Sequence, residues 1–333
     1  MRKMVYIAFM VLLVALSSSC QRRGFSEHTT AINLKLEIKT DVLHSGSSSI
    51  PSMMRVDLFN PQTGQVEYTD YISAGGGYIY PRPGTYNMLV YNIGTESTIV
   101  RNENNLGTVE AYTNEVSAYL KSQMKSFLEK RYEMRTRSKE EPVTKDPVLS
   151  GTEHIVNEPD YLWVGRYDAL EIPALELDEE REMTIQVEAA SVVETWKIEL
   201  APVEGLEWIS KVSALITGQT ESTYIGKNED SDGVVTIYFE MGKDTEKKSL
   251  VGTFNTFGKN PLYSSILSLD INIIDNLGNE HHYHFDITED FFGNDEFFIP
   301  ITEPIVIEEP KVEGGGFAPS VGDWEDVRTE IEL

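Results

Sequence analysis

The sequence predicts an all-β protein of two tandem antiparallel β-sandwiches, with one amphipathic helix inserted in the first. Its length of 333 residues corresponds to two domains of ordinary size. Apolar and polar residues alternate with a period of two in several segments, which is typical of strands with one buried face. Turn residues separate these segments and helical stretches are few, so antiparallel sandwiches are favoured over a doubly wound sheet.

Four segments have the clearest alternation. In each one, apolar side chains occupy every second position and therefore share one face of the strand. These segments are residues 32–38, 183–189, 196–200 and 267–273. Turn sequences such as Asn-Pro-Gln-Thr-Gly at 60–64 and Asn-Leu-Gly-Asn at 276–279 indicate hairpins between neighbouring strands.

Residues 114–139 form the one clear exception. The segment has good helix formers and no proline or glycine, with Asn114 as a plausible N-cap. Apolar side chains recur at three- and four-residue intervals, which predicts a helix lying on a sheet. They are Val116, Leu120, Met124, Phe127 and Leu128. We expect the basic residues to form its solvated face; they are Lys121, Lys125, Lys130, Arg131, Arg135, Arg137 and Lys139.

A charged turn at residues 178–180 is the expected domain boundary, with sandwiches at 31–178 and 179–307. Residues 308–333 begin with a proline- and glycine-containing lead and end in an alternating segment. Val327, Thr329, Ile331 and Leu333 would line one face of this terminal strand. The strand is either donated to another molecule or closes the second sandwich of its own chain.

The N-terminus predicts a secretory signal peptide at residues 1–19. Arg2 and Lys3 precede the apolar run 5–16, which is shorter than the ~20 residues of a membrane-spanning helix. Cys20, the one cysteine of the chain, follows three serines. This layout resembles a bacterial lipoprotein signal, which implies cleavage between Ser19 and Cys20 and acylation of Cys20, for example with palmitate.

Such acyl chains would hold the protein on a membrane, with residues 20–30 as the lipid-anchored linker. Gln21, rather than aspartate, follows the cysteine. Retention at the inner membrane is therefore not favoured, and we expect an outer-membrane protein at the cell surface.

Charge and motifs exclude several other functions. The 54 acidic residues exceed the 28 basic ones, giving a net charge of −26, which argues against a nucleic-acid-binding protein. No nucleophile elbow, P-loop, zinc-protease or dinucleotide-binding motif occurs in the sequence, so we expect neither an enzyme nor a cofactor.

Two segments could be mistaken for metal sites. The run 281–284 contains three histidines, but only His282 and His284 would share a strand face, and two ligands do not complete a site. Residues 228–233 begin like a calcium loop, yet Phe239 stands where the final acidic ligand should be. We therefore predict no metal and interpret Asp232-Gly233 as a hairpin turn between 223–225 and 234–241.

The best candidates for ligand-binding aromatic residues are Tyr78 and Tyr80, because they follow three glycines at 75–77. Exposed tyrosine rings can stack on sugar rings. A surface lipoprotein that binds host or other glycans is thus the alternative to the function inferred next.

Several segments together resemble the fimbrillin-like lipoproteins of Bacteroidetes-type bacteria, especially their minor, anchor-type subunits. They are the lipid cysteine, the first strand 32–40, residues 81–92, 158–163 and 194–200, and the terminal Gly-Gly-Gly-Phe and Asp-Trp segment. The resemblance implies transthyretin-like sandwiches, pilus assembly, cell adhesion and other fimbrial subunits as partners.

Within that family, shaft subunits lose their first strand by cleavage after an arginine. Arg22 and Arg23 precede the first strand here and Arg55 falls within a predicted strand, so the resemblance favours a subunit that keeps its lipid. Assembly would proceed by strand addition, in which an incoming strand pairs with an exposed sheet edge.

Overall fold

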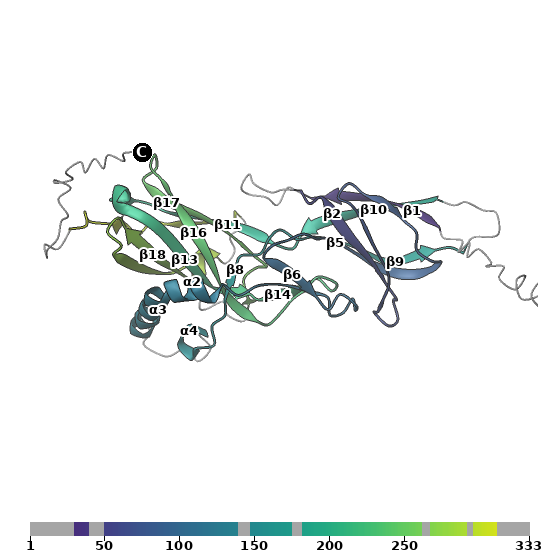
Figure 1. Cartoon of the computed structure of the whole chain (residues 1–333), viewed down its shortest axis with the longest axis horizontal. Coiled ribbons are helices and arrows are strands. Elements are labelled where there is room, and N and C mark those ends of the chain that lie inside the picture. Colours follow the sequence, from purple (N-terminus) through teal and green to yellow (C-terminus); the bar gives the residue numbers. More distant parts are fainter. Residues whose placement is uncertain are drawn as a thin grey trace, which may run out of the picture.

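Alternating apolar side chains build the first sandwich, which is a single curled sheet. The computed structural model describes residues 30–39, 50–138, 147–174, 182–261, 267–291 and 296–311. In these residues the first sheet has the order β3-β2-β5-β9-β10-β1-β4 (Figure 1). Its strands are β1 (Ala31–Ile38), β2 (Met53–Phe59), β3 (Val66–Ser73), β4 (Gly77–Ile79), β5 (Gly84–Asn92), β9 (Trp163–Ile172) and β10 (Glu182–Ser191). Ile32 and Leu34 lie fully buried in its core, as their alternation predicts.

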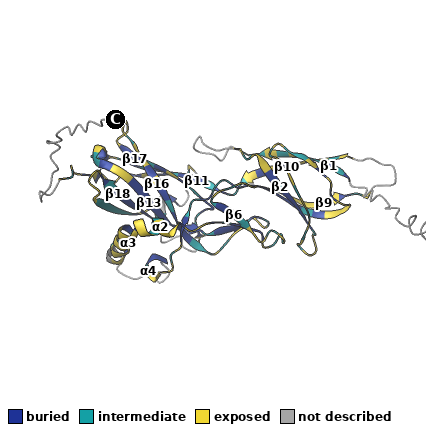
Figure 2. Ribbon diagram, viewed as in Figure 1, coloured by how far each residue is buried: buried dark blue, intermediate teal, exposed yellow. Residues whose placement is uncertain are grey.

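The second sandwich contains the larger core. Its sheet has the order β19-β18-β13-β16-β17-β11-β20, and β8 pairs with β16. The strands are β8 (Ile155–Asn157), β11 (Glu194–Leu200), β13 (Ile209–Thr220), β16 (Val234–Asp244), β17 (Ser249–Thr256), β18 (Ser268–Asp275), β19 (Glu280–Asp286) and β20 (Phe298–Ile301). Trp196, the first residue of the alternating segment 196–200, is buried and stacks on Phe291 with ring centroids 4.0 Å apart. Buried residues follow the strands of both sandwiches (Figure 2).

A third sheet joins the two sandwiches. It has the order β15-β14-β7-β6 and takes two strands from each half of the chain. They are β6 (Thr98–Arg101), β7 (Glu110–Thr113), β14 (Ser222–Tyr224) and β15 (Glu229–Asp230). The buried Glu110 carboxylate accepts bonds from Arg101 (2.8 and 2.9 Å) and from the Ser222 hydroxyl (2.5 Å). Backbone and side-chain hydrogen bonds therefore both cross the junction.

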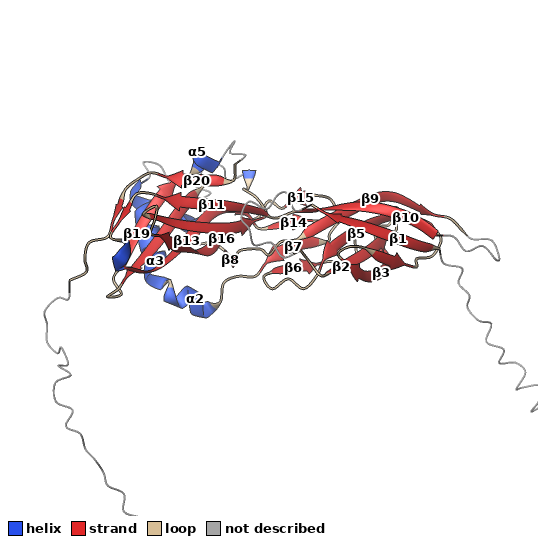
Figure 3. Cartoon of the chain, turned by 90° about the horizontal axis from the view of Figure 1, so that it is seen from above, coloured by secondary structure: helices blue, strands red, loops and turns tan. Residues whose placement is uncertain are grey.

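The predicted helix is inserted in the sequence of the first sandwich but covers the second (Figure 3). It forms α2 (Ala118–Gln123) and α3 (Lys125–Ser138), followed by the short α4 (Pro147–Ser150). Ser117, rather than Asn114, caps α2, because its hydroxyl accepts from the Leu120 N–H at 3.1 Å. The placement on the second sandwich was not predicted. It follows because Val116 and β8 bond to each other and β8 pairs with β16.

Three other expectations differ from the structure. The expected boundary at residue 178 falls one strand too early, since β10 pairs with β9 and β1 of the first sheet. Not all pairings are antiparallel. β1–β10, β11–β20 and β8–β16 are parallel, and so is the pair of β12 (Val203–Glu204) with β21 (Ile305–Val306). Asp232-Gly233 does not link a hairpin of 223–225 with 234–241, because β14 pairs with β15 and β7. The all-β prediction of two tandem sandwiches is confirmed.

The described chain enters and leaves this elongated body at opposite ends (Figure 1). Thr30 and the start of β1 lie at the far end of the first sandwich, where the Thr30 hydroxyl donates to the Pro173 carbonyl. The last strand, β21 (Ile305–Val306), lies at the far end of the second sandwich, paired with β12 (Val203–Glu204).

Candidate functional site

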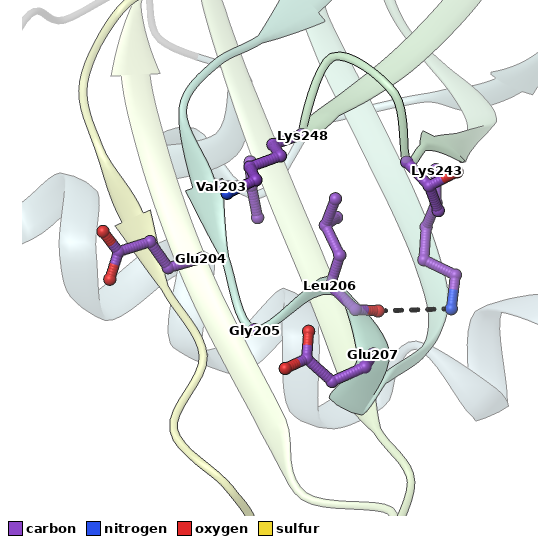
Figure 4. A pocket seen from close by; sticks show the side chains of 8 residues that line it. Val203, Glu204, Gly205, Leu206, Glu207, Lys243 and Lys248 are labelled. Carbon is purple, nitrogen blue, oxygen red and sulfur yellow. Dashed lines mark hydrogen bonds between the residues drawn. The ribbon is translucent and has the colours of Figure 1, made fainter.

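The far end of the second sandwich contains a cavity of about 430 Å³ (Figure 4). Residues 203–207 line one side, and the β16–β17 hairpin supplies Lys243, Thr245 and Lys248 on the other. The Lys243 ammonium group donates to the backbone carbonyls of Ile209 (2.7 Å) and Leu206 (3.3 Å). Lys243 therefore joins the hairpin to the loop before β13 and fixes the shape of the cavity.

A glycine allows β21 to pack against this cavity wall. Gly205 has φ +78° and precedes the short 3₁₀ helix η2 (Leu206–Trp208). A Cβ atom there would lie 1.9 Å from the Ile307 carbonyl oxygen, so any side chain would displace the segment after β21. The Ile307 N–H in turn donates to the Glu204 carbonyl at 2.9 Å.

β21 presents an open edge at this end of the molecule. Among the described residues it pairs only with β12, in a two-stranded sheet. Val306 is 54% exposed on it. An edge strand with an exposed apolar side chain is the feature to which another strand can add.

The opposite end of the molecule holds the first strand securely. β1 pairs in parallel with β10 over eight residue pairs and in antiparallel fashion with β4 on its other side. Ser19 and Cys20, the predicted cleavage and lipidation residues, lie outside the described residues. The described chain thus starts with a strand that is already paired on both sides.

The predicted donor strand also lies outside the described residues, so Val327, Thr329, Ile331 and Leu333 have no structural account. The described chain ends at Lys311, beyond the β12–β21 pair.

The two candidate aromatic residues are both exposed but face different surroundings. The exposed fractions of Tyr78 and Tyr80 are 49% and 53%. The Tyr78 hydroxyl donates to Glu182 Oε1 at 3.0 Å, across β1. Tyr80 instead lines a second cavity together with Tyr68 and Tyr86. The structure thus separates two residues that the sequence placed together.

Sequence reasoning missed a buried ionic cluster beneath α3. Arg131 and Arg135 were expected on the solvated face, yet they are 0% and 2% exposed. Both arginines bond to the Thr217 hydroxyl, and Arg135 also bonds to Ser268. The signal was present in the spacing, because residues 131 and 135 follow Phe127 at four-residue steps on one helix face.

Carboxylates of the second sandwich neutralise this cluster. Arg131 pairs with Asp270 (2.5 Å) and with Glu153 (2.6 Å). Burial alone would raise the pKa of Asp270, but Arg131 and the hydrogen bond from His284 lower it to about 2. Burial alone would lower the pKa of Arg131, while Glu153 and Asp270 raise it above its ordinary value. The cluster is therefore a charged, structural contact between helix and sheet.

The histidine run takes part in the same contact. His284 Nδ1 bonds to Asp270 Oδ1 at 2.6 Å, and His282 stacks on Phe127 with ring centroids 5.6 Å apart. In the part of the chain that the structure describes, no group of three His, Cys, Asp or Glu side chains could hold a metal ion. Nor is any helix of those residues long and apolar enough to cross a membrane.

The fold places the chain in a recognisable class of two-domain β-sandwich proteins. One similar structure is a crystal structure of “a putative adhesin” from Bacteroides ovatus ATCC 8483. The alignment covers 88% of this chain and 98% of the adhesin chain, with a TM-score of 0.57 and 22% sequence identity. “The fimbrial anchor protein Mfa2” from Porphyromonas gingivalis aligns with 84% of this chain and 90% of its own, with a TM-score of 0.46 at 10% identity.

The family follows from the sequence itself. Residues 19–240 match the family model described as “Domain of unknown function (DUF5119)”, and the chain belongs to this family. A curated relative, “Putative fimbrium anchoring subunit Fim4B” of Bacteroides ovatus, is 28% identical over 242 residues. That match covers 72% of this chain and 62% of the relative's length. The resemblance to the fimbrillin-like family is thus confirmed.

Proposed function

We propose that this protein is a fimbrial subunit of the anchoring kind. In this proposal, a lipid on Cys20 holds the far end of the first sandwich at the outer membrane. The far end of the second sandwich carries the next fimbrial subunit. The relative named as a fimbrium anchoring subunit supports this role.

The observation that carries the proposal is the position of the two chain ends. β1 begins at one end of the long axis, and β21 lies at the other (Figure 1). A protein that links a membrane to a filament needs its two attachment points far apart. Entry and exit at opposite ends meet that requirement without any bend in the chain.

The state of the first strand supports an anchor rather than a shaft subunit. β1 is paired on both sides, and Ile32 and Leu34 fill the core of the first sandwich. In the part of the chain that the structure describes, β1 therefore fills the position between β10 and β4 that an incoming strand would need. In this proposal, strand addition takes place at the other end, at the open edge of β21 and with residues 327–333 as the candidate donor strand.

Lipidation can be tested by fractionating cells that express the wild type, Cys20→Ala or Ser18→Ala. We expect wild type and Ser18→Ala in the outer-membrane fraction, with antibody against this protein labelling the bases of surface filaments in electron micrographs. Cys20→Ala should leave the protein unacylated, with filaments shed into the medium. Wild-type protein that carries a free thiol, or firmly held filaments in Cys20→Ala cells, would contradict the proposal.

A further inference from the structure

The sheet of the first sandwich has an unpaired edge among the described residues. β3 is one edge of that sheet, and residues 80–83 pass near it without joining the ladder. Pro81 and Pro83 have no N–H group, so this segment cannot add a regular strand. The Tyr68 hydroxyl takes the place of a ladder bond by accepting from the Tyr80 N–H at 2.9 Å.

A cavity of about 630 Å³ lies beside this edge, and it is lined by Glu67, Tyr68, Tyr80, Arg82 and Tyr86. Its volume falls within the roughly 300–1,000 Å³ that small-molecule sites occupy. Three aromatic rings and two groups of opposite charge thus meet in one hollow at the surface.

Hydrogen bonds fix two of the three rings. The Tyr68 hydroxyl donates to Asp70 Oδ2 at 2.5 Å, and the Tyr86 hydroxyl donates to the Arg82 carbonyl at 3.2 Å. Tyr86 is buried, with 6% of its surface exposed, whereas Tyr80 is 53% exposed. The Tyr80 ring is therefore the one whose face a ligand can cover.

The combination of groups defines the class of ligand. A pyranose ring has an apolar C–H face and a polar edge that carries its hydroxyl groups. An aromatic ring can pack its own face against that C–H face. A carboxylate accepts hydrogen bonds and a guanidinium donates them, so Glu67 and Arg82 suit the hydroxyl groups of that edge. The opposite charges make a purely anionic or cationic ligand a poorer match. We propose that this cavity is a saccharide-binding site with Tyr80 as its stacking platform.

This cavity lies at the same end of the first sandwich as the start of β1, because Ile79 pairs with Ile32 and Gly84 pairs with Ile172. None of the residues that line it belongs to the proposed lipid or strand-addition sites. Tyr78, two residues before Tyr80, provides a matched control. It is similarly exposed, but its hydroxyl bonds to Glu182 and it does not line the cavity. A saccharide held by the cavity should depend on Tyr80 and not on Tyr78.

The test uses the wild type, Tyr80→Ala, Tyr80→Phe and Tyr78→Ala on an array of bacterial and host glycans. We expect the wild type to bind a subset of glycans, and Tyr80→Ala to weaken that binding about tenfold or more. Tyr80→Phe and Tyr78→Ala should bind like the wild type, because both variants keep an aromatic ring at position 80. Circular dichroism checks that each variant is folded.

Three results would overturn the proposal: no glycan bound by the folded wild type, equal binding by Tyr80→Ala, or an equal loss in Tyr78→Ala. A Tyr80→Ala protein that binds glycans normally but fails to enter filaments would instead assign the cavity to a protein partner. None of these outcomes bears on lipidation at Cys20, so the two proposals fail independently.

Discussion

Arg131 on α3 and Asp270 on β18 form a fully buried ion pair, with Nε and Oδ2 2.5 Å apart. The pair joins a helix inserted in the first half of the chain to the sheet of the second half. Taking two charges out of water is costly, and their bonds to Glu153, Thr217 and His284 offset that cost. The contact therefore fixes where the helix docks.

Arg131→Met should destabilise the protein by about 3–5 kcal/mol, because it leaves the buried Asp270 and the partly buried Glu153 without their main partner. Urea unfolding of the soluble chain from residue 21 measures this change. Lys130→Met is the matched control, since Lys130 is 54% exposed beside Glu133. Its effect should stay within about 0.5 kcal/mol. Equal losses in both variants would contradict a special role for Arg131.

The same cluster predicts a loss of stability in acid. The pKa of Asp270 is lowered from 3.8 to about 2, so the folded state holds this carboxylate ionised where the unfolded state would bind a proton. Its contribution is complete above about pH 4 and is lost as the pH falls toward 2. Asp270→Asn should be less stable at neutral pH and should lose less stability over that interval. The free energy of unfolding of both proteins, measured by urea unfolding, is compared between pH 4 and pH 2. Equal losses of stability in the wild type and Asp270→Asn would refute this assignment.

Gly205→Ala should loosen the end of the second sandwich. Its Cβ would lie 1.9 Å from the Ile307 carbonyl oxygen, in addition to the cost of a left-handed backbone for alanine. Gly278→Ala isolates that backbone cost of about 1–2 kcal/mol, because Gly278 has φ +87° and no neighbouring atom within 4 Å. Limited proteolysis after β20 should be faster in Gly205→Ala alone. Equal cleavage of the two variants would mean that the Ile307 contact is unimportant.

Deletion of residues 321–333 separates the two roles left open for the terminal strand. If the strand is donated, the melting temperature should not change and filament assembly should fail. A lower melting temperature would show that the strand belongs to its own sandwich. In the full chain, Ile331→Asp should reproduce the assembly defect by placing a charge on the apolar face, whereas Glu330→Gln on the other face should not.

The strands were predictable because their signal is local. Ile32 and Leu34 are buried, and Asn33 between them is not, as a period of two requires. Parallel pairing of β1 with β10 was not predictable, because it joins strands separated by most of the first domain.

In the helix, the buried apolar residues could be predicted from the sequence, whereas the buried charges could not. Met124 and Phe127 are buried as their spacing predicts. Arg131 and Arg135 lie on the same face, but a buried charge can be inferred only when its partner is known, and Asp270 is 139 residues away. Tyr80 was identified as exposed, whereas the cavity beside it depends on how β3 and residues 80–83 meet.

The pairing of β1 with β10 determines how the molecule would respond to mechanical tension. A pull on the N-terminal linker acts on β1, while β10 leads toward the second sandwich and transmits the opposing force. Because these strands are parallel and aligned from Ala31 with Glu182 to Ile38 with Ala189, the load acts in shear. Their hydrogen bonds would share that load and break together, instead of opening one after another as in a zipper.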